Sequence, residues 1–227
     1  MQLLSSAVDI LAGHWNAMCS ANQVVNLTRI TDPMDAARKH YADSLALIAS
    51  GRLKAGDGPL LDIGTGAGFP AVPLACSDNE LDVTAIDSRG KKIQFLRDWL
   101  LGQPFEVVRT DTREAAGQAQ DPTLIPEEVD RDALALPNLT IVHAHSDHWE
   151  SERVYTWVVA RAVAAEKALH HAERHLSRDG TIALFSTPGA DFKGVAPRGI
   201  RMVGTYDYAF SSDDGPLNRR LAFFQRG

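Results

Sequence analysis

The sequence is poor in cysteine and contains no long apolar run. Its 227 residues include only two cysteines, Cys19 and Cys76, which lie far apart in the chain. This usage fits free thiols in a reducing compartment better than a disulfide framework. No run approaches the roughly 18 apolar residues that a membrane span needs. The first five residues also lack a basic stretch followed by an apolar core, so we expect a cytoplasmic protein that is neither secreted nor membrane-bound.

Positive charge is also scarce. The chain has 23 Lys and Arg residues against 29 Asp and Glu residues, which gives a formal net charge of −6. Proteins that bind nucleic acids are usually basic, so the net charge argues against such a partner. The distribution weakens that objection, because residues 101–137 hold eight acids and three bases and leave the rest of the chain near neutrality. Basic clusters remain at three places: Arg29 with Arg38, Lys39 and His40; Arg89 with Lys91 and Lys92; and Arg198 with Arg201.

Residues 101–137 differ in composition from the rest of the chain. They contain four prolines and many acids, which predicts an acidic, solvated surface insertion. One alternative is that Phe105 to Val108 forms the third strand of the sheet in place of Leu139 to His143. We favour the later strand because it leads directly into the apolar run at 155–160.

From residue 60 onward, short apolar runs alternate with helical patterns. This alternation is typical of an α/β fold with a mostly parallel sheet covered on both faces. Residues 1–50 are expected to be helical, and Asp32-Pro33 supplies a cap and an N-terminal proline for their last helix. We therefore expect an N-terminal helical cap at 1–55 and an α/β domain at 56–227. The expected strands are 60–63, 83–86, 139–143, 155–160 and 181–185, the expected helices are 70–76, 91–101 and 166–176, and the runs 201–206 and 220–224 are expected to form an antiparallel closing hairpin.

One motif connects the first two strands. Residues 60–70, Leu-Leu-Asp-Ile-Gly-Thr-Gly-Ala-Gly-Phe-Pro, pass from an apolar strand into an acid and three alternate glycines, and the second strand ends on Asp87. Glycines let the backbone turn tightly and approach a ligand, and a carboxylate at the end of the second strand can accept hydrogen bonds from ribose hydroxyls. We therefore expect a nucleoside site at the carboxyl ends of the strands, where Asp62, Asp87 and Arg161 would lie. The alternative is a tight glycine turn that binds nothing.

The position of Asp62 indicates which nucleoside would bind. Dinucleotide-binding loops usually read Gly-x-Gly-x-x-Gly and receive a pyrophosphate at a helix N-terminus. Here Asp62 precedes the first glycine and would repel a diphosphate. It would suit a ligand with an ammonium group, and S-adenosylmethionine carries both an amino acid end and a sulfonium.

Histidines raise the question of a metal site. His143 and His145 alternate along one strand and His148 follows, but no cysteine lies near them. Structural and catalytic zinc sites need a compact set of ligands, and no known spacing fits. We therefore expect no metal.

Several further blocks accompany the glycine motif. They are Asn26-Leu27-Thr28, Arg38-Lys39-His40-Tyr41-Ala42-Asp43-Ser44-Leu45, Ile86-Asp87-Ser88, Gly90-Lys91-Lys92, Phe95-Leu96-Arg97 and Ala160-Arg161-Ala162-Val163-Ala164. With these blocks the chain resembles the bacterial small-subunit (16S) ribosomal RNA guanine-N7 methyltransferases, also called the glucose-inhibited division protein B family. The resemblance covers roughly residues 14–185, apart from the acidic insertion.

This resemblance implies a class I, Rossmann-like methyltransferase fold with S-adenosylmethionine as cofactor. The implied product is 7-methylguanosine in small-subunit ribosomal RNA, and the implied partner is that RNA or the small ribosomal subunit. The protein itself is expected to be a monomer. The implied methyl-transfer pocket contains Asn26, His40, Asp43 and Arg161. The implied cofactor contacts are Asp62, Gly64, Thr65, Gly66, Gly68, Phe69, Asp87, Ser88 and Arg161, with Ser146 and Asp147 against the adenine, or Asp111 and Thr112 if the earlier strand is the third one.

The chemistry of guanine N7 shapes what these residues can do. N7 carries a free lone pair and no proton, so methyl transfer needs alignment and exclusion of water more than a general base. Arg161 stays protonated and cannot act as a base. It either positions a phosphate or a base edge, or pairs with Asp43 or Asp147 and braces the edge of the sheet. His40 could stack on a base or serve the structure alone.

Two other functions remain open. The family usually has Lys-Gly where this chain reads Ser186-Thr187-Pro188-Gly189. Together with the acidic net charge, this leaves room for a methyltransferase with a small-molecule or protein substrate. A third possibility is a non-catalytic nucleoside-binding module.

Overall fold

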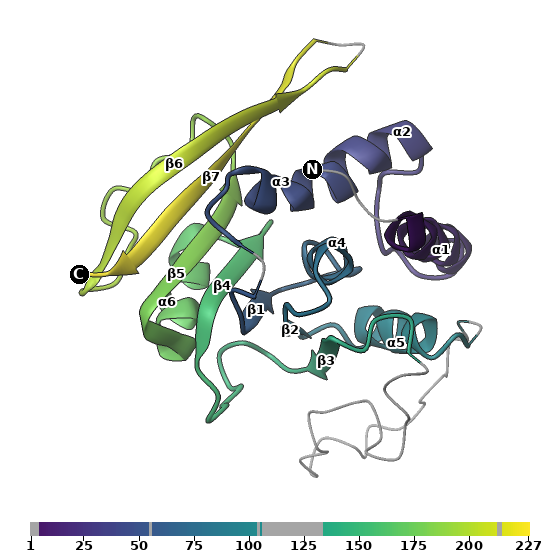
Figure 1. Cartoon of the computed structure of the whole chain (residues 1–227), viewed down its shortest axis with the longest axis horizontal. Helices are drawn as coiled ribbons and strands as arrows, with labels where there is room; N and C mark the ends of the chain where they lie inside the picture. The colour runs from purple at the N-terminus through teal and green to yellow at the C-terminus, as the bar shows by residue number, and fades with distance from the viewer. Residues whose placement is uncertain (1–4, 55, 104, 106–133, 213–214) are drawn as a thin grey trace.

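The computed structural model describes residues 5–54, 56–103, 105, 134–212 and 215–227 (Figure 1). Its centre is a seven-stranded sheet with the strand order β3-β2-β1-β4-β5-β7-β6. The strands are β1 (Leu60–Ile63), β2 (Val83–Asp87), β3 (Leu139–His143), β4 (Tyr155–Arg161), β5 (Leu176–Ser186), β6 (Ile200–Phe210) and β7 (Leu217–Arg226). Strands β1 to β5 pair in parallel, whereas β7 is antiparallel to both β5 and β6. The predicted α/β fold with an antiparallel closing hairpin is confirmed.

Helices cover both faces of the sheet. They are α1 (Ser5–Asn22), α2 (Pro33–Ala36), the π-helical turn η1 (Ala37–Ala42), α3 (Asp43–Ala49), α4 (Ala71–Ser77), α5 (Gly90–Leu100) and α6 (Ala165–His175). Residues of α1, α3, α4 and α5 pack in one apolar cluster, and α6 packs in the cluster on the other face. Because both faces are covered, every residue of β1 is buried, which explains why this strand reads as a continuous apolar run around Asp62.

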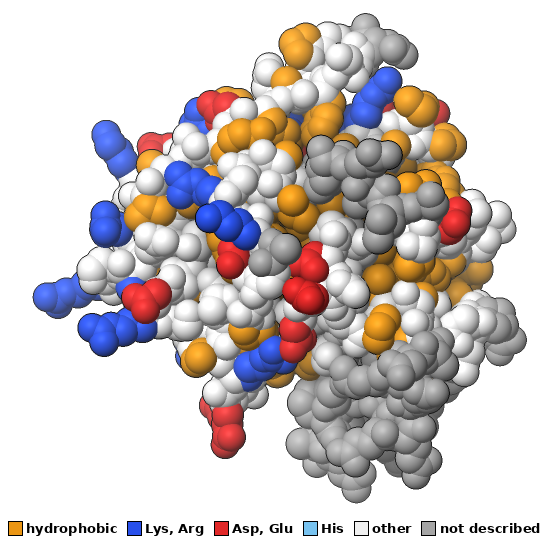
Figure 2. Space-filling model, viewed as in Figure 1, with side chains coloured by type: hydrophobic (Ala, Val, Ile, Leu, Met, Phe, Trp, Pro, Cys, Tyr) orange, Lys and Arg blue, Asp and Glu red, His pale blue; other side chains and the backbone are white. Residues whose placement is uncertain are grey.

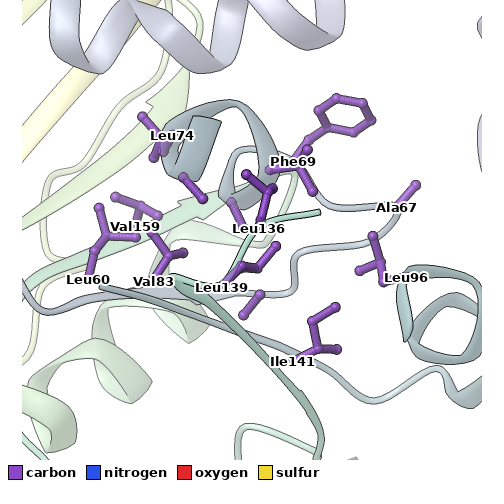
Figure 3. Packing of buried hydrophobic residues seen from close by; sticks show 14 of the residues in the cluster. Leu60, Ala67, Phe69, Leu74, Val83, Leu96, Leu136, Leu139, Ile141 and Val159 are labelled. Carbon is purple, nitrogen blue, oxygen red and sulfur yellow. The ribbon is translucent and has the colours of Figure 1, made fainter. Parts of the chain in front are cut away.

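The first cluster fixes the three strands nearest the glycine motif. Figure 3 shows Leu60, Val83 and Leu139 of the three neighbouring strands lying together beneath Leu74 of α4. In the register of the sheet, Leu60 stands beside Val83 and Val83 beside Leu139. Burial of this kind stabilises the fold by about 25 cal/mol for each square ångström of apolar surface removed from water.

The third strand is Leu139–His143, as we favoured, and it pairs with β2. Of the alternative strand, only Phe105 lies within the described residues, and it is outside any strand. Most of the predicted acidic insertion lies outside the described residues. At its end, however, Leu134 and Leu136 are 6% and 4% exposed, and Figure 3 shows Leu136 among the core side chains. The prediction of a solvated surface segment is therefore wrong for Leu134 and Leu136, although Ala135 between them is exposed.

The last helix of the N-terminal region is interrupted by a π-turn. Pro33 starts it as predicted, and the Asp32 carboxylate accepts the N–H of Asp35 at 2.8 Å. From Ala37 to Ala42 the helix widens into η1 before α3 continues it. The hydrophobic pattern of residues 36–50 gave no sign of this widening. Single π-turns occur often beside functional sites, and this one contains His40 and ends at Ala42, directly before Asp43.

The chain ends in the long β6–β7 hairpin. Lys and Arg side chains gather on the side of the molecule where these strands lie (Figure 2). Arg201, Arg219, Arg220 and Arg226 come from the two strands, and Arg220 pairs with Asp207 across them. None of the described helices is long and apolar enough to cross a membrane.

Candidate functional site

A cavity of about 410 Å³ lies at the carboxyl ends of β1, β2, β3 and β4. Strand β1 has β2 on one side and β4 on the other, so the strand order reverses here (Figure 1). Open parallel sheets bind ligands at this kind of reversal. The lining residues are Leu27, Thr28, His40, Ile63, Gly64, Thr65, Gly66, Ala67, Phe69, Ile86, Asp87, Ser88, Arg89, Lys92, Ala144, His145, Ser146, Arg161, Ala162, Val163 and Lys167.

The glycine motif forms one wall of the cavity. Gly64, Gly66 and Gly68 have φ values of 76°, 64° and 100°, in the left-handed region that side chains rarely adopt. The N–H groups of Gly64 and Thr65 both donate to the carbonyl of Ile86, at 2.9 and 3.0 Å, which ties the loop to the end of β2. A Cβ at Gly68 would come within 2.6 Å of Val72 Cγ2. These positions need glycine for their backbone angles, and Gly68 also needs it for space.

Gly68→Ala is therefore expected to destabilise the protein by about 1–3 kcal/mol, through backbone strain and overpacking. Urea unfolding would measure this loss. Gly51→Ala is the matched control, because Gly51 also has a positive φ of 70° but a Cβ added there would meet no atom within 4 Å. An equal loss in both variants would show that crowding at Gly68 contributes nothing.

Asp87 is held by the backbone around it. Its Oδ2 accepts the N–H of Gly66 at 2.9 Å, and its Oδ1 accepts the N–H of Arg89 at 2.8 Å. The carboxylate lines the cavity and fastens the glycine loop from the neighbouring strand. Each carboxylate oxygen has a further lone pair that can accept a hydroxyl. Asp87 thus ties the loop to β2 and keeps free lone pairs at the cavity wall.

Asp62 lies behind the glycine loop, outside the cavity wall. It is fully buried, its Oδ2 accepts the N–H of Ala71 at 3.2 Å, and its Oδ1 has no hydrogen-bond partner among the described residues. Burial raises the pKa of this carboxyl to about 7, although the Thr65 side chain and the N–H of Ala71 act in the opposite direction. In the described structure it supports the first turn of α4 and leaves one buried acceptor oxygen without a partner.

Arg161 joins the end of β4 to the π-turn. Its Nη1 donates to the carbonyl of Lys39 at 3.0 Å and to Asp43 Oδ2 at 3.2 Å, while its Nη2 donates to His40 Nδ1 at 3.2 Å. The predicted pairing with Asp43 is thus present, and the guanidinium also lines the cavity. Arg161 was expected either to position the substrate or to brace the edge of the sheet. This geometry is compatible with both, because the guanidinium that holds η1 and α3 also lines the cavity.

These contacts fix the protonation of His40. Because Arg161 can only donate, His40 Nδ1 must accept, and the neutral ring then carries its proton on Nε2. That nitrogen lies 2.8 Å from Thr28 Oγ1, to which it donates. Burial, and then the charge of Arg161, lower the pKa of His40 to about 4. His40 is therefore neutral at physiological pH, and it stacks on Phe69 with ring centroids 4.6 Å apart.

Asp43 lies beneath Arg161 and outside the cavity wall. It is 4% exposed, and its Oδ1 accepts the hydroxyl of Tyr208 at 2.8 Å, with Arg219 Nε at 3.8 Å. Tyr208 and Arg219 belong to the C-terminal hairpin. Asp43 therefore connects three parts of the chain that are far apart in sequence.

His14 of α1 links this helix to the glycine loop by a hydrogen bond. Its Nε2 donates to the carbonyl of Ala67 at 2.9 Å, and its Nδ1 accepts the hydroxyl of Tyr41 at 2.8 Å. Burial lowers the pKa of this fully buried ring to about 4, chiefly by desolvation. The sequence offered no motif for this residue, because its partners are 27 and 53 positions away.

His14 gives the protein a stability that depends on pH. Its pKa in the fold lies below the unfolded value of 6.5, so its contribution is complete above pH 6.5 and is lost as the pH falls toward 4. The expected loss is about 3 kcal/mol. His14→Gln should be less stable at pH 7 but should show a shallower fall in unfolding free energy between pH 6.5 and 4. Urea unfolding across that range tests this, with exposed His170→Gln as the control, and parallel curves for wild type and His14→Gln would contradict it.

The far end of the cavity is formed by the loop after β3. Ser146 lines it together with Ser88, Ala144 and His145. Asp147 does not line it; its carboxylate contacts Lys167 Nζ at 3.5 Å and His171 Nε2 at 2.7 Å on α6, and His145 Nδ1 at 3.2 Å. The segment holding Asp111 and Thr112 lies outside the described residues.

The structure thus brings most of the expected site residues together. Those in the cavity wall are His40, Gly64, Thr65, Gly66, Phe69, Asp87, Ser88, Ser146 and Arg161. Asp62, Asp43 and Gly68 lie just behind that wall, Asp147 faces α6, and Asn26 is exposed outside it. Thr28 and Lys92, which appeared in the sequence only as parts of motifs, also line the cavity, and the hairpin residue Tyr208 was not expected. Within the described residues, no group of three metal-ligating side chains could hold a metal ion.

Residues 8–118 match the family described as rRNA small subunit methyltransferase G. The ribosomal RNA small subunit methyltransferase G of Anaeromyxobacter dehalogenans is 43% identical over 92 residues, which are 40% of this chain and 41% of that protein. The chain spans about two fifths of the length of the curated relatives it matches. The resemblance to this family is confirmed for the matched part of the chain.

Solved structures show the same fold at low sequence identity. A TehB-like SAM-dependent methyltransferase from Corynebacterium glutamicum superposes with a TM-score of 0.53 at 17% identity, covering 96% of each chain. A variant of MtNAS in complex with S-adenosylmethionine gives a TM-score of 0.53 at 13% identity, covering 96% of this chain and 75% of that one. The fold is the class I methyltransferase fold that the resemblance implied.

Proposed function

Because residues 8–118 match rRNA small subunit methyltransferase G, we propose that this chain transfers a methyl group from S-adenosylmethionine to guanine N7 of small-subunit (16S) ribosomal RNA. The observation that carries the proposal is the fixed carboxylate of Asp87 beside the glycine turn, at the reversal of strand order. The protein would act in the cytoplasm as a monomer, with residues 1–55 as a cap on a methyltransferase domain at 56–227.

The cavity fits an adenosyl cofactor in size and chemistry. Its volume of about 410 Å³ lies within the range of sites for small molecules. Asp87 would accept the ribose hydroxyls, Ser88 and Ser146 would border the adenine, and Gly64 to Gly66 would border the methionine end. The cofactor supplies a methyl group made electrophilic by the sulfonium. Asp62 lies behind the glycine loop and does not line the cavity, so an ammonium group in the cavity would reach its unpartnered Oδ1 only through a bridging water.

The residues above the glycine turn would receive the guanine. His40 and Phe69 form a stacked aromatic pair in the cavity wall, and a purine could add to it. Arg161 lies beside them with its guanidinium carbon 5.2 Å from the Phe69 ring centroid. It would donate to guanine O6 and hold N7 toward the methyl group. The guanine ring gains a positive charge as N7 is methylated. Because His40 is neutral, it adds no further positive charge there, and Asp43 beneath Arg161 offsets the charge of the guanidinium.

Analysis of ribosomal RNA nucleosides by mass spectrometry tests the function. Small subunits and naked small-subunit RNA from cells that lack this gene would be incubated with the protein and S-adenosylmethionine. We expect 7-methylguanosine to appear in one of the two substrates. Methylation of small metabolites or proteins but of neither RNA would favour the second function, and binding of S-adenosylmethionine without transfer to any acceptor would favour a non-catalytic module.

A further inference from the structure

A second hollow of about 450 Å³ adjoins the cavity. The turn after α1 and the start of α5 line it. These two helices pack together, and Figure 1 shows their position in the fold. Three residues of the hollow, Leu27, Arg89 and Lys92, also line the cavity, so the two spaces lie side by side. Its full lining is Val24, Val25, Asn26, Leu27, Arg89, Gly90, Lys91 and Lys92.

The charge of this hollow has one sign. Arg89, Lys91 and Lys92 contribute three cationic side chains, and no acid lines it. Arg89 and Lys91 are exposed, and within the described part of the chain none of the three cations forms an ion pair. Lys92 is half-buried between the two spaces, and its Nζ would lie 3.4 Å from a Cβ added at Gly66. Unpaired cations on a protein with a net charge of −6 favour an anionic ligand at this place.

The opposite wall is apolar, with one exposed amide. Val24 is 67% exposed, and the Asn26 side chain makes no hydrogen bond to another described residue. This wall is nevertheless fixed, because Asn22 donates to the carbonyl of Thr28 at 3.0 Å and accepts the N–H groups of Leu27 and Thr28 at 2.8 and 3.0 Å. A rigid wall that combines apolar surface with a free amide can contact a base, which has both an apolar face and polar edges.

We propose that this hollow binds the nucleotide next to the target guanine in single-stranded RNA. Arg89 and Lys91 would contact its phosphodiester, and Val24 and Asn26 would contact its base. The proposal deepens the function above and rests on it. A guanine that enters the cavity must be splayed out of its stack, and its neighbour along the strand must then lie within one nucleotide of the cavity mouth. The hollow has the required position, because Leu27, Arg89 and Lys92 are shared between the two spaces.

Lys91 provides the test, because it lines the hollow but not the cavity. Lys91→Ala should weaken binding of a short single-stranded RNA that contains the target sequence, and it should reduce the slope of log affinity against log salt by about 0.7, the value for one lost phosphate contact. Lys91→Glu should weaken binding by about tenfold or more, since repulsion replaces attraction. The KM for RNA should rise. The kcat and the dissociation constant of S-adenosylmethionine should stay unchanged.

Lys54→Ala and Lys54→Glu are the matched controls. Lys54 is exposed and precedes β1, so it lies near the amino ends of the strands and away from the site. Its substitutions therefore change the net charge by the same amount without touching the hollow. An unchanged salt slope and RNA affinity in the Lys91 variants would overturn the proposal, as would an equal loss in the Lys54 variants or a loss of cofactor binding. A loss confined to assembled subunits, with naked RNA bound normally, would assign the hollow to an acidic protein surface instead. If wild-type protein neither binds nor methylates RNA, the proposed function itself fails.

Discussion

Asp87→Ala is expected to weaken the binding of S-adenosylmethionine by about 1–3 kcal/mol, the contribution of hydrogen bonds to a charged group. This corresponds to a dissociation constant about 5–150 times higher. The variant loses the acceptor for the ribose, and it also frees the N–H groups of Gly66 and Arg89 that the carboxylate holds. Both effects act on the same side of the cavity, so the loss should lie toward the upper end of the range.

Isothermal titration calorimetry measures this loss. Asp179→Ala is the matched control, since Asp179 is an exposed acid outside the cavity. Asp87→Asn separates the two effects, because an amide oxygen can replace only one of the two acceptors. If Asp87→Ala binds S-adenosylmethionine as tightly as wild type does, the assignment of Asp87 to the ribose is wrong.

Arg161→Ala is expected to have the largest effect on turnover and on stability together. The side chains of Arg161 and Asp43 are 15% and 6% exposed, so removal of the cation leaves a buried carboxylate without its main partner. Breaking such a pair costs about 3–5 kcal/mol. We expect methyl transfer to fall strongly while the dissociation constant of S-adenosylmethionine changes little, because the hydrogen bonds of Arg161 go to residues of η1 and α3 and not to the glycine loop.

The double variant Arg161→Ala with Asp43→Asn separates bracing from substrate contact. The introduced asparagine amide carries no charge and can still accept the hydroxyl of Tyr208, so most of the unfolding free energy should return. Methyl transfer should stay low if Arg161 touches the guanine. If turnover recovers together with stability, Arg161 only positions η1 and α3.

Site residues that lie at the ends of strands could be predicted from the sequence. Asp87 and Arg161 each end an apolar run, and in a parallel sheet such ends meet at one edge. The glycine loop was predictable because its positive φ values leave a local signature, three alternate glycines after a strand. These features depend on a few neighbouring residues, which is why one sequence was enough.

Contacts between distant segments could not be predicted in this way. Asp43 and Tyr208 are 165 positions apart, and the partners of His14 come from two other segments. Asp147 shows the same limit on a smaller scale, because its neighbour Ser146 lines the cavity while Asp147 itself faces α6. The buried residues Leu134 and Leu136 were hidden by the acidic average of the segment that contains them.

A crystal structure of the protein with S-adenosylhomocysteine would test the central claim most directly. We predict that its ribose hydroxyls lie within hydrogen-bond distance of Asp87, its adenine beside Ser88 and Ser146, and its amino acid end along Gly64 to Gly66. An adenosine bound elsewhere, or a cavity that instead takes a nicotinamide dinucleotide with its pyrophosphate over the glycine loop, would contradict the account.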